Sequence, residues 1–143
     1  MEKIEHDYKQ AFKAHQRVKI DVLRLLKSAI KNAEIAARHN LNDEEIIAVL
    51  TTEAKRRREA LALYQQGGRA DLAAKEQAEL QELMYYLPTQ YSDQELETVV
   101  KETIAELKAR PGDFGRVMGS VMKKIKGQAE GERVSATVKT LLR

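Results

Sequence analysis

Residues 113–127 read DFGRVMGSVMKKIKG and contain the clearest helical pattern in the chain. Six apolar residues recur at intervals of three and four and would form one helix face: Phe114, Val117, Met118, Val121, Met122 and Ile125. Gly115 and Gly119 lie one turn apart and leave another side of that helix without side chains. Because glycine inside a helix costs about 1 kcal/mol relative to alanine, we expect something to approach the backbone closely there.

Two kinds of neighbour would explain this glycine stripe, Gly115 and Gly119. One is another helix of the same domain. The other is a nucleic-acid sugar-phosphate backbone, because phosphate-binding residue types lie beside the stripe. The candidate nucleic-acid-binding residues are Arg116, Ser120, Lys123, Lys124, Lys126 and Lys139. Between Gly112 and Arg143 the formal balance is +4, which exceeds the +3 of the whole chain.

The same spacing of apolar residues continues through the rest of the sequence, and no useful length alternates with period two. We therefore predict seven helices, no strand and an all-α fold. Asn42 with Glu45, and Ser92 with Glu95, have the spacing of capping boxes that begin helices.

Proline and glycine residues indicate where the chain divides. Pro88 cannot continue a helix and should end the last helix of the first domain. We predict an N-terminal helical bundle over residues 1–88 and a small three-helix domain over residues 92–143. Within the second domain, Gly127 should form the tight turn between the last two helices.

Composition excludes most enzyme classes. The 143 residues include no cysteine, and the three histidines lack the spacing of metal ligands. No phosphate-binding loop, dinucleotide fingerprint or nucleophile elbow occurs, so we expect no catalytic residue, metal or cofactor. The N-terminus does not resemble a secretory signal, and no apolar run approaches the roughly 20 residues needed to span a bilayer. We expect a cytoplasmic protein that does not bind membranes.

Arg57 lies among the core-facing positions of the predicted third helix, three residues after Ala54 and four before Leu61. Glu53, one turn earlier, is its expected partner in a structural ion pair. The alternative is that Arg57 binds a ligand.

A basic stripe runs along the predicted second helix, where Arg17, Arg24, Lys31 and Arg38 recur every seven residues, with Lys27 alongside. It should point away from the apolar side of that helix. It is either an ordinary solvated face or a surface for nucleic acid or an acidic protein.

These motifs together resemble the GatB/YqeY family. The run over residues 115–131 looks like the family's glycine-rich signature, and it follows Glu53-Ala-Lys-Arg-Arg57, Tyr86-Leu-Pro88 and Ser92-Asp-Gln-Glu95 in the family's order. The resemblance implies a helical bundle followed by a small domain similar to the tRNA-binding tail of the amidotransferase B subunit. The signature positions Gly115, Gly119 and Gly127 are then mainly scaffold. Lys123 departs from stand-alone relatives, in which proline is expected, and is more similar to the amidotransferase tail.

The resemblance implies a tRNA-binding or amidotransferase-associated accessory protein that is not catalytic by itself. An alternative is a protein-interaction module that docks on an aminoacyl-tRNA synthetase or an amidotransferase. A carbon–nitrogen ligase with glutamine as amido-nitrogen donor is the third reading, which family membership alone suggests. The residues disfavour it, because they offer no nucleophile, ammonia site or nucleotide cradle, and the B subunit's large catalytic domain is missing.

Overall fold

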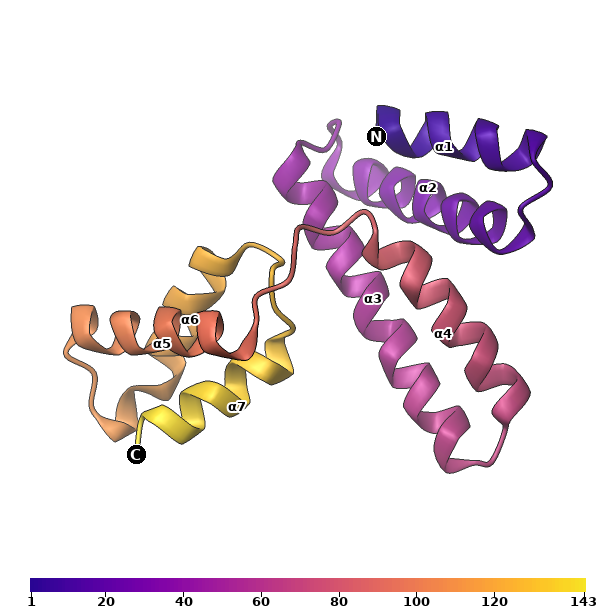
Figure 1. Ribbon diagram of the computed structural model, residues 1–143. Helices are drawn as coiled ribbons and strands as arrows, with labels where there is room; N and C mark the ends of the chain where they lie inside the picture. Colours follow the sequence, from indigo (N-terminus) through magenta and orange to yellow (C-terminus); the bar gives the residue numbers. More distant parts are fainter. The chain divides into compact units, whose positions relative to one another are not determined.

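The computed structural model describes all residues from 1 to 143 and contains helices but no strand (Figure 1). The all-α prediction is confirmed, and the seven predicted helices are present. The elements are α1 (Glu2–Lys13), α2 (Arg17–Ala37), α3 (Asp43–Gln66), α4 (Ala70–Met84), α5 (Asp93–Leu107), a 3-10 turn η1 (Pro111–Asp113), α6 (Phe114–Ile125) and α7 (Gly131–Leu141).

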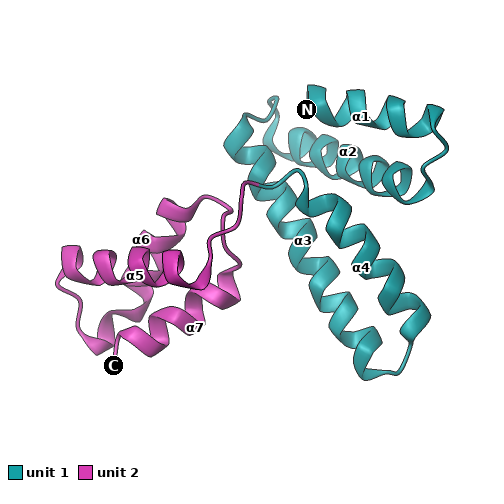
Figure 2. Ribbon diagram, viewed as in Figure 1, with its two compact units in different colours: residues 1–87 teal, residues 88–143 magenta.

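The chain forms two compact units, each with its own core (Figure 2). Unit 1 comprises Met1–Leu87 and contains α1 to α4, whereas unit 2 comprises Pro88–Arg143 and contains α5 to α7.

Local side-chain chemistry sets several helix ends. The Asn42 side chain accepts a hydrogen bond from the Glu45 backbone N–H at 2.9 Å, and the Glu45 carboxylate accepts one from the Asn42 N–H at 3.1 Å. At their C-terminal ends, α2, α5 and α6 are capped by basic residues in the left-handed conformation, Arg38, Lys108 and Lys126. These left-handed caps accommodate the change of chain direction without glycine.

Unit 1 is built around α2, which buries two faces. One face places Val22 and Leu26 against α3 and α4. The other places Leu23 and Ile30 against α1, which contributes Ile4 and other apolar residues. Each fully buried residue of this size stabilises the fold by about 1.5–3 kcal/mol.

Unit 2 has a single core beneath α5, α6 and α7. Its α6 contribution is Val117, Val121 and Ile125, which are completely buried. The residues before α5 are held to the turn after α6: the Tyr91 N–H donates to the Gln128 carbonyl at 2.7 Å, and the Gln90 side chain donates to the Gly127 carbonyl at 2.9 Å. The burial of Val117, Val121 and Ile125 fixes which side of α6 faces outward.

Candidate nucleic-acid interface

The glycine stripe of α6 lies opposite the core-facing side of the helix and borders open space. Apart from the adjoining residues and the backbone of α6 itself, no atom lies within 4 Å of a Cβ atom built at Gly115 or at Gly119. The expectation that another helix of the same domain packs on this stripe is therefore wrong. The reason is that α6 meets α5 and α7 through Val117, Val121 and Ile125, on its other side.

Two of the predicted basic residues are engaged within unit 2. The Lys124 Nζ donates to the Thr103 hydroxyl at 2.9 Å and to the Glu106 carboxylate at 2.8 Å, so it is directed toward α5. Arg116 donates from Nη2 to the Leu107 carbonyl at 2.7 Å. Arg116 nevertheless keeps about half of its side-chain surface exposed (55%), so it can still contribute positive charge.

The remaining candidates lie along the outer side of α6 and at its two ends. Lys123 is exposed, forms no ion pair and follows Arg116 by two turns, about 10 Å along the helix. Ser120 is half-buried between them. Lys139, from α7, lies with Nζ 5.9 Å from the centre of the Phe114 ring at the start of α6. Lys126 caps the other end of α6 with φ 42°.

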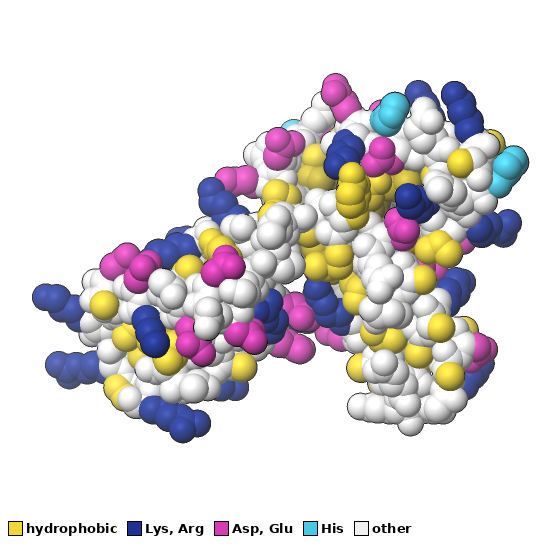
Figure 3. Space-filling view, in the orientation of Figure 1, with side chains coloured by type: hydrophobic (Ala, Val, Ile, Leu, Met, Phe, Trp, Pro, Cys, Tyr) yellow, Lys and Arg dark blue, Asp and Glu magenta, His cyan; other side chains and the backbone are white.

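Charge is unevenly distributed among the helices of unit 2. Helix α5 carries five acidic residues and one basic residue, whereas α6 carries three basic residues and no acidic one. Basic side chains project from the surface of this unit, with acidic ones nearby (Figure 3). A polyanion would therefore approach unit 2 from the α6 side rather than from α5.

Gly127 begins the turn after α6 with φ 83°, a left-handed conformation that glycine adopts without the steric cost of a Cβ atom. Its carbonyl accepts the Gln90 hydrogen bond described above. The turn therefore fixes where α6 ends and where Lys126 is placed.

In unit 1, the structure corrects the predicted partner of Arg57. Its Nη1 donates to the Glu76 carboxylate at 3.1 Å and also to the Glu79 carboxylate, both on α4. Glu53 instead pairs with the exposed Arg56 at 3.1 Å. The cause is the α3–α4 hairpin, which places α4 carboxylates opposite Arg57. Neither carboxylate was predicted as a partner of Arg57, although the spacing of Glu76 and Glu79 from Leu80 and Leu83 places both on the core-facing side of α4.

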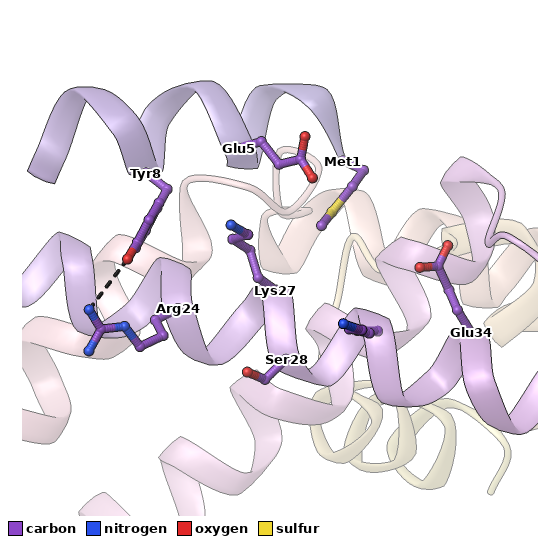
Figure 4. A pocket seen from close by; sticks show the side chains of 8 residues that line it. Met1, Glu5, Tyr8, Arg24, Lys27, Ser28 and Glu34 are labelled. Atoms are coloured by element: carbon purple, nitrogen blue, oxygen red, sulfur yellow. Dashed lines mark hydrogen bonds between the residues drawn. The ribbon is translucent and has the colours of Figure 1, made fainter.

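A groove of about 460 Å³ lies between α1 and α2 (Figure 4). The three basic residues that line it, Arg24, Lys27 and Lys31, all come from α2, so the structure gathers the middle of the basic stripe beside α1. Arg24 donates from Nη2 to the Tyr8 hydroxyl at 3.3 Å, and this hydrogen bond raises the pKa of the guanidinium. This groove could not be predicted from the sequence, because the heptad spacing of the basic residues does not show where α1 packs on α2.

The end of unit 1 holds a second perturbed group. Burial, followed by a hydrogen bond of 2.6 Å to the Asp7 carboxylate, raises the pKa of the Tyr86 hydroxyl. The neighbouring Tyr85 ring meets Tyr86 edge-on, with 5.2 Å between centroids, and stays 65% exposed. No helix in the structure has both the length and the apolar character needed to cross a membrane.

Comparison with known proteins identifies relatives along the whole chain. The family model described as Yqey-like protein matches residues 1–142. A protein of Pyrenophora tritici-repentis named "Altered inheritance of mitochondria protein 41, mitochondrial" is 27% identical over 98% of this chain and 79% of its own length. A protein of the same name from Vanderwaltozyma polyspora is 32% identical over 76% of this chain, which matches 60% of that relative.

The names of these two relatives contradict the expected cytoplasmic location, because both are described as mitochondrial. The expectation rested on the lack of cysteine and of a secretory signal. Those features do not distinguish among the compartments of a cell.

Proposed function

This chain belongs to the YqeY-like protein family, and from that premise we propose that it is a tRNA-binding accessory protein whose α6 face contacts the RNA backbone. The relatives' names refer to inheritance of mitochondria and specify no ligand. The ligand is therefore argued from the surface of unit 2.

The observation that carries the proposal is the open space over the glycine stripe. No part of unit 2 uses the close approach that Gly115 and Gly119 permit. Each glycine still costs helix stability, so a neighbour outside the chain accounts for them better than internal packing does. A sugar-phosphate backbone is such a neighbour, because backbone contacts need little room and no particular base.

The charges beside the stripe favour a phosphate-bearing partner. Arg116 and Lys123 flank it two turns apart, and Lys139 adds a third positive charge at the start of α6. Each phosphate that a basic residue neutralises releases counterions and makes binding more salt-dependent, with a slope of about −0.7 to −0.9 per contact. The proposed binding surface therefore consists of the outer side of α6 together with one lysine of α7.

Salt-titrated fluorescence anisotropy with labelled bulk tRNA tests the proposal. Lys123→Gln with Lys139→Gln should weaken binding and make the salt slope shallower by about 1.5, because two phosphate contacts are lost. The matched control is Lys9→Gln with Lys13→Gln on α1, which removes the same charge elsewhere and should change the slope little. An equal loss in both double variants would show attraction by net charge alone.

A steric variant separates contact from charge. Gly119→Gln adds a neutral side chain over the stripe, so it should weaken tRNA binding while leaving the charge and the core unchanged. If the wild-type chain shows no saturable tRNA binding even at low salt, the proposal fails. The docking module for a synthetase or amidotransferase then becomes the hypothesis to pursue.

A further inference from the structure

The groove between α1 and α2 combines three positive charges with hydroxyl groups. Arg24, Lys27 and Lys31 occupy successive turns of α2, about 4.5 and 6 Å apart along its axis. The Tyr8 phenol and the Ser28 hydroxyl line the same groove. Figure 4 shows Lys27 rising from α2 toward α1, with Tyr8 on one side and Glu5 on the other.

None of the three basic side chains has a carboxylate within ion-pair distance. Arg24 is hydrogen-bonded to Tyr8, and Lys27 Nζ lies 4.6 Å from the centre of the same ring. Lys31 forms no ion pair. Arg24 and Lys31 are exposed and Lys27 is partly buried. Arg57 of the same unit, by contrast, pairs with two α4 carboxylates. These three positive charges outnumber the two carboxylates that line the groove, Glu5 and Glu34, so an anion would be attracted to it.

The shape and charge of the groove restrict the anion. Glu5 and Glu34 also line it, so a long polyanion running through would meet two negative charges. A compact anion needs only part of the groove and can reach the basic side chains without running past both carboxylates. The volume of about 460 Å³ matches a small ligand and is too small for a partner helix.

The donors favour phosphate. Arg24 uses one nitrogen for Tyr8, which leaves the rest of its planar fork available, and such a fork binds phosphate oxygens in pairs. Two lysines provide further point charges, which suits an ion of charge near −2 that has several oxygens. We propose that this groove binds the terminal phosphate group of a small phosphorylated ligand through Arg24, Lys27 and Lys31.

The test uses the full-length, isotope-labelled chain and inorganic pyrophosphate, followed by amide chemical shifts at constant ionic strength set with sodium chloride. Saturable shifts confined to α1 and the middle of α2 are expected. Arg24→Gln with Lys31→Gln should weaken binding about tenfold or more, since charge-assisted hydrogen bonds are lost. Lys9→Gln with Lys13→Gln should bind like wild type. Shifts that rise linearly with concentration, or that weaken equally in both variants, would overturn the proposal.

Two further arms identify the source of the phosphate and guard against misfolding. Tyr8→Phe keeps the ring but removes the hydrogen bond that positions Arg24, so it should weaken pyrophosphate binding with an unchanged melting temperature. Competition by a 5′-phosphorylated oligonucleotide, but not by its 5′-hydroxyl form, would identify a nucleic-acid end as the source. Competition by neither would identify a free phosphorylated compound.

The site is independent of the proposed tRNA surface, so the two ideas fail separately. The Lys123→Gln, Lys139→Gln variant should bind pyrophosphate normally. If only long RNA perturbed the groove and pyrophosphate did not, the groove would be part of a polyanion surface, and the small-ligand proposal would be wrong.

Discussion

Replacing Gly119 with alanine should stabilise the protein, although glycine-to-alanine changes in folded proteins frequently do harm. Gly119 lies in the middle of α6, its φ is not positive, and a Cβ atom there would meet nothing within 4 Å. Alanine therefore has the higher helix propensity, lowers the entropy of the unfolded chain and causes no clash. We expect the free energy of unfolding to rise by about 0.8–1 kcal/mol. The same change at Gly115, in the first turn of α6, should gain less.

Urea denaturation followed by far-UV circular dichroism measures the change. Hydrogen exchange of the Val121 and Ile125 amides assigns the change to unit 2. Gly127→Ala is the matched opposite case, because φ 83° should make it cost about 1–2 kcal/mol. If Gly119→Ala destabilised unit 2 by a similar amount, another part of the protein would have to contact that face of α6. The glycine stripe would then not be open.

Two predictions concern unit 1. Arg57→Met should cost about 3 kcal/mol, because it leaves the buried Glu79 without its partner, and adding Glu79→Leu should recover most of the loss in the same urea assay. Glu53→Ala should have little effect, and a loss as large as that of Arg57→Met would contradict the observed pairing. Because the pKa of Tyr86 is raised in the folded protein, the stability that this hydroxyl contributes is complete below about pH 10, the pKa of tyrosine in the unfolded chain. That contribution is lost as the pH rises above this value. Tyr86→Phe should cost about 1 kcal/mol at neutral pH and make the alkaline loss of stability shallower, and a curve unchanged from wild type would refute this role.

The parts of the fold that local sequence determines were predictable. Apolar spacing identified the helices, and Asn42 with Glu45 forms the expected capping box, because helix periodicity and capping depend on residues within one or two turns. For α6 the core-facing residues Val117, Val121 and Ile125 also follow from spacing, since only one side of that helix is apolar.

Features that depend on distant segments were not predictable in the same way. The sequence pointed to one apolar side for the second helix, but α2 buries two faces, because α1 packs on one side of it and the α3–α4 pair on another. The partner of Arg57 comes from α4, and no rule based on neighbouring residues selects it over Glu53. Spacing likewise identified the glycine stripe of α6 but carried no information on what lies above it.

The left-handed cap of α6 has a consequence for protein engineering. A lysine at φ 42° is strained relative to glycine by roughly 1 kcal/mol, so selection for thermal resistance alone would favour Lys126→Gly. A library screened only for heat tolerance should therefore enrich glycine at this position and lose a positive charge beside the candidate RNA surface. A screen for both thermal stability and ligand binding would show whether Lys126 is kept at the expense of stability because it contributes to binding.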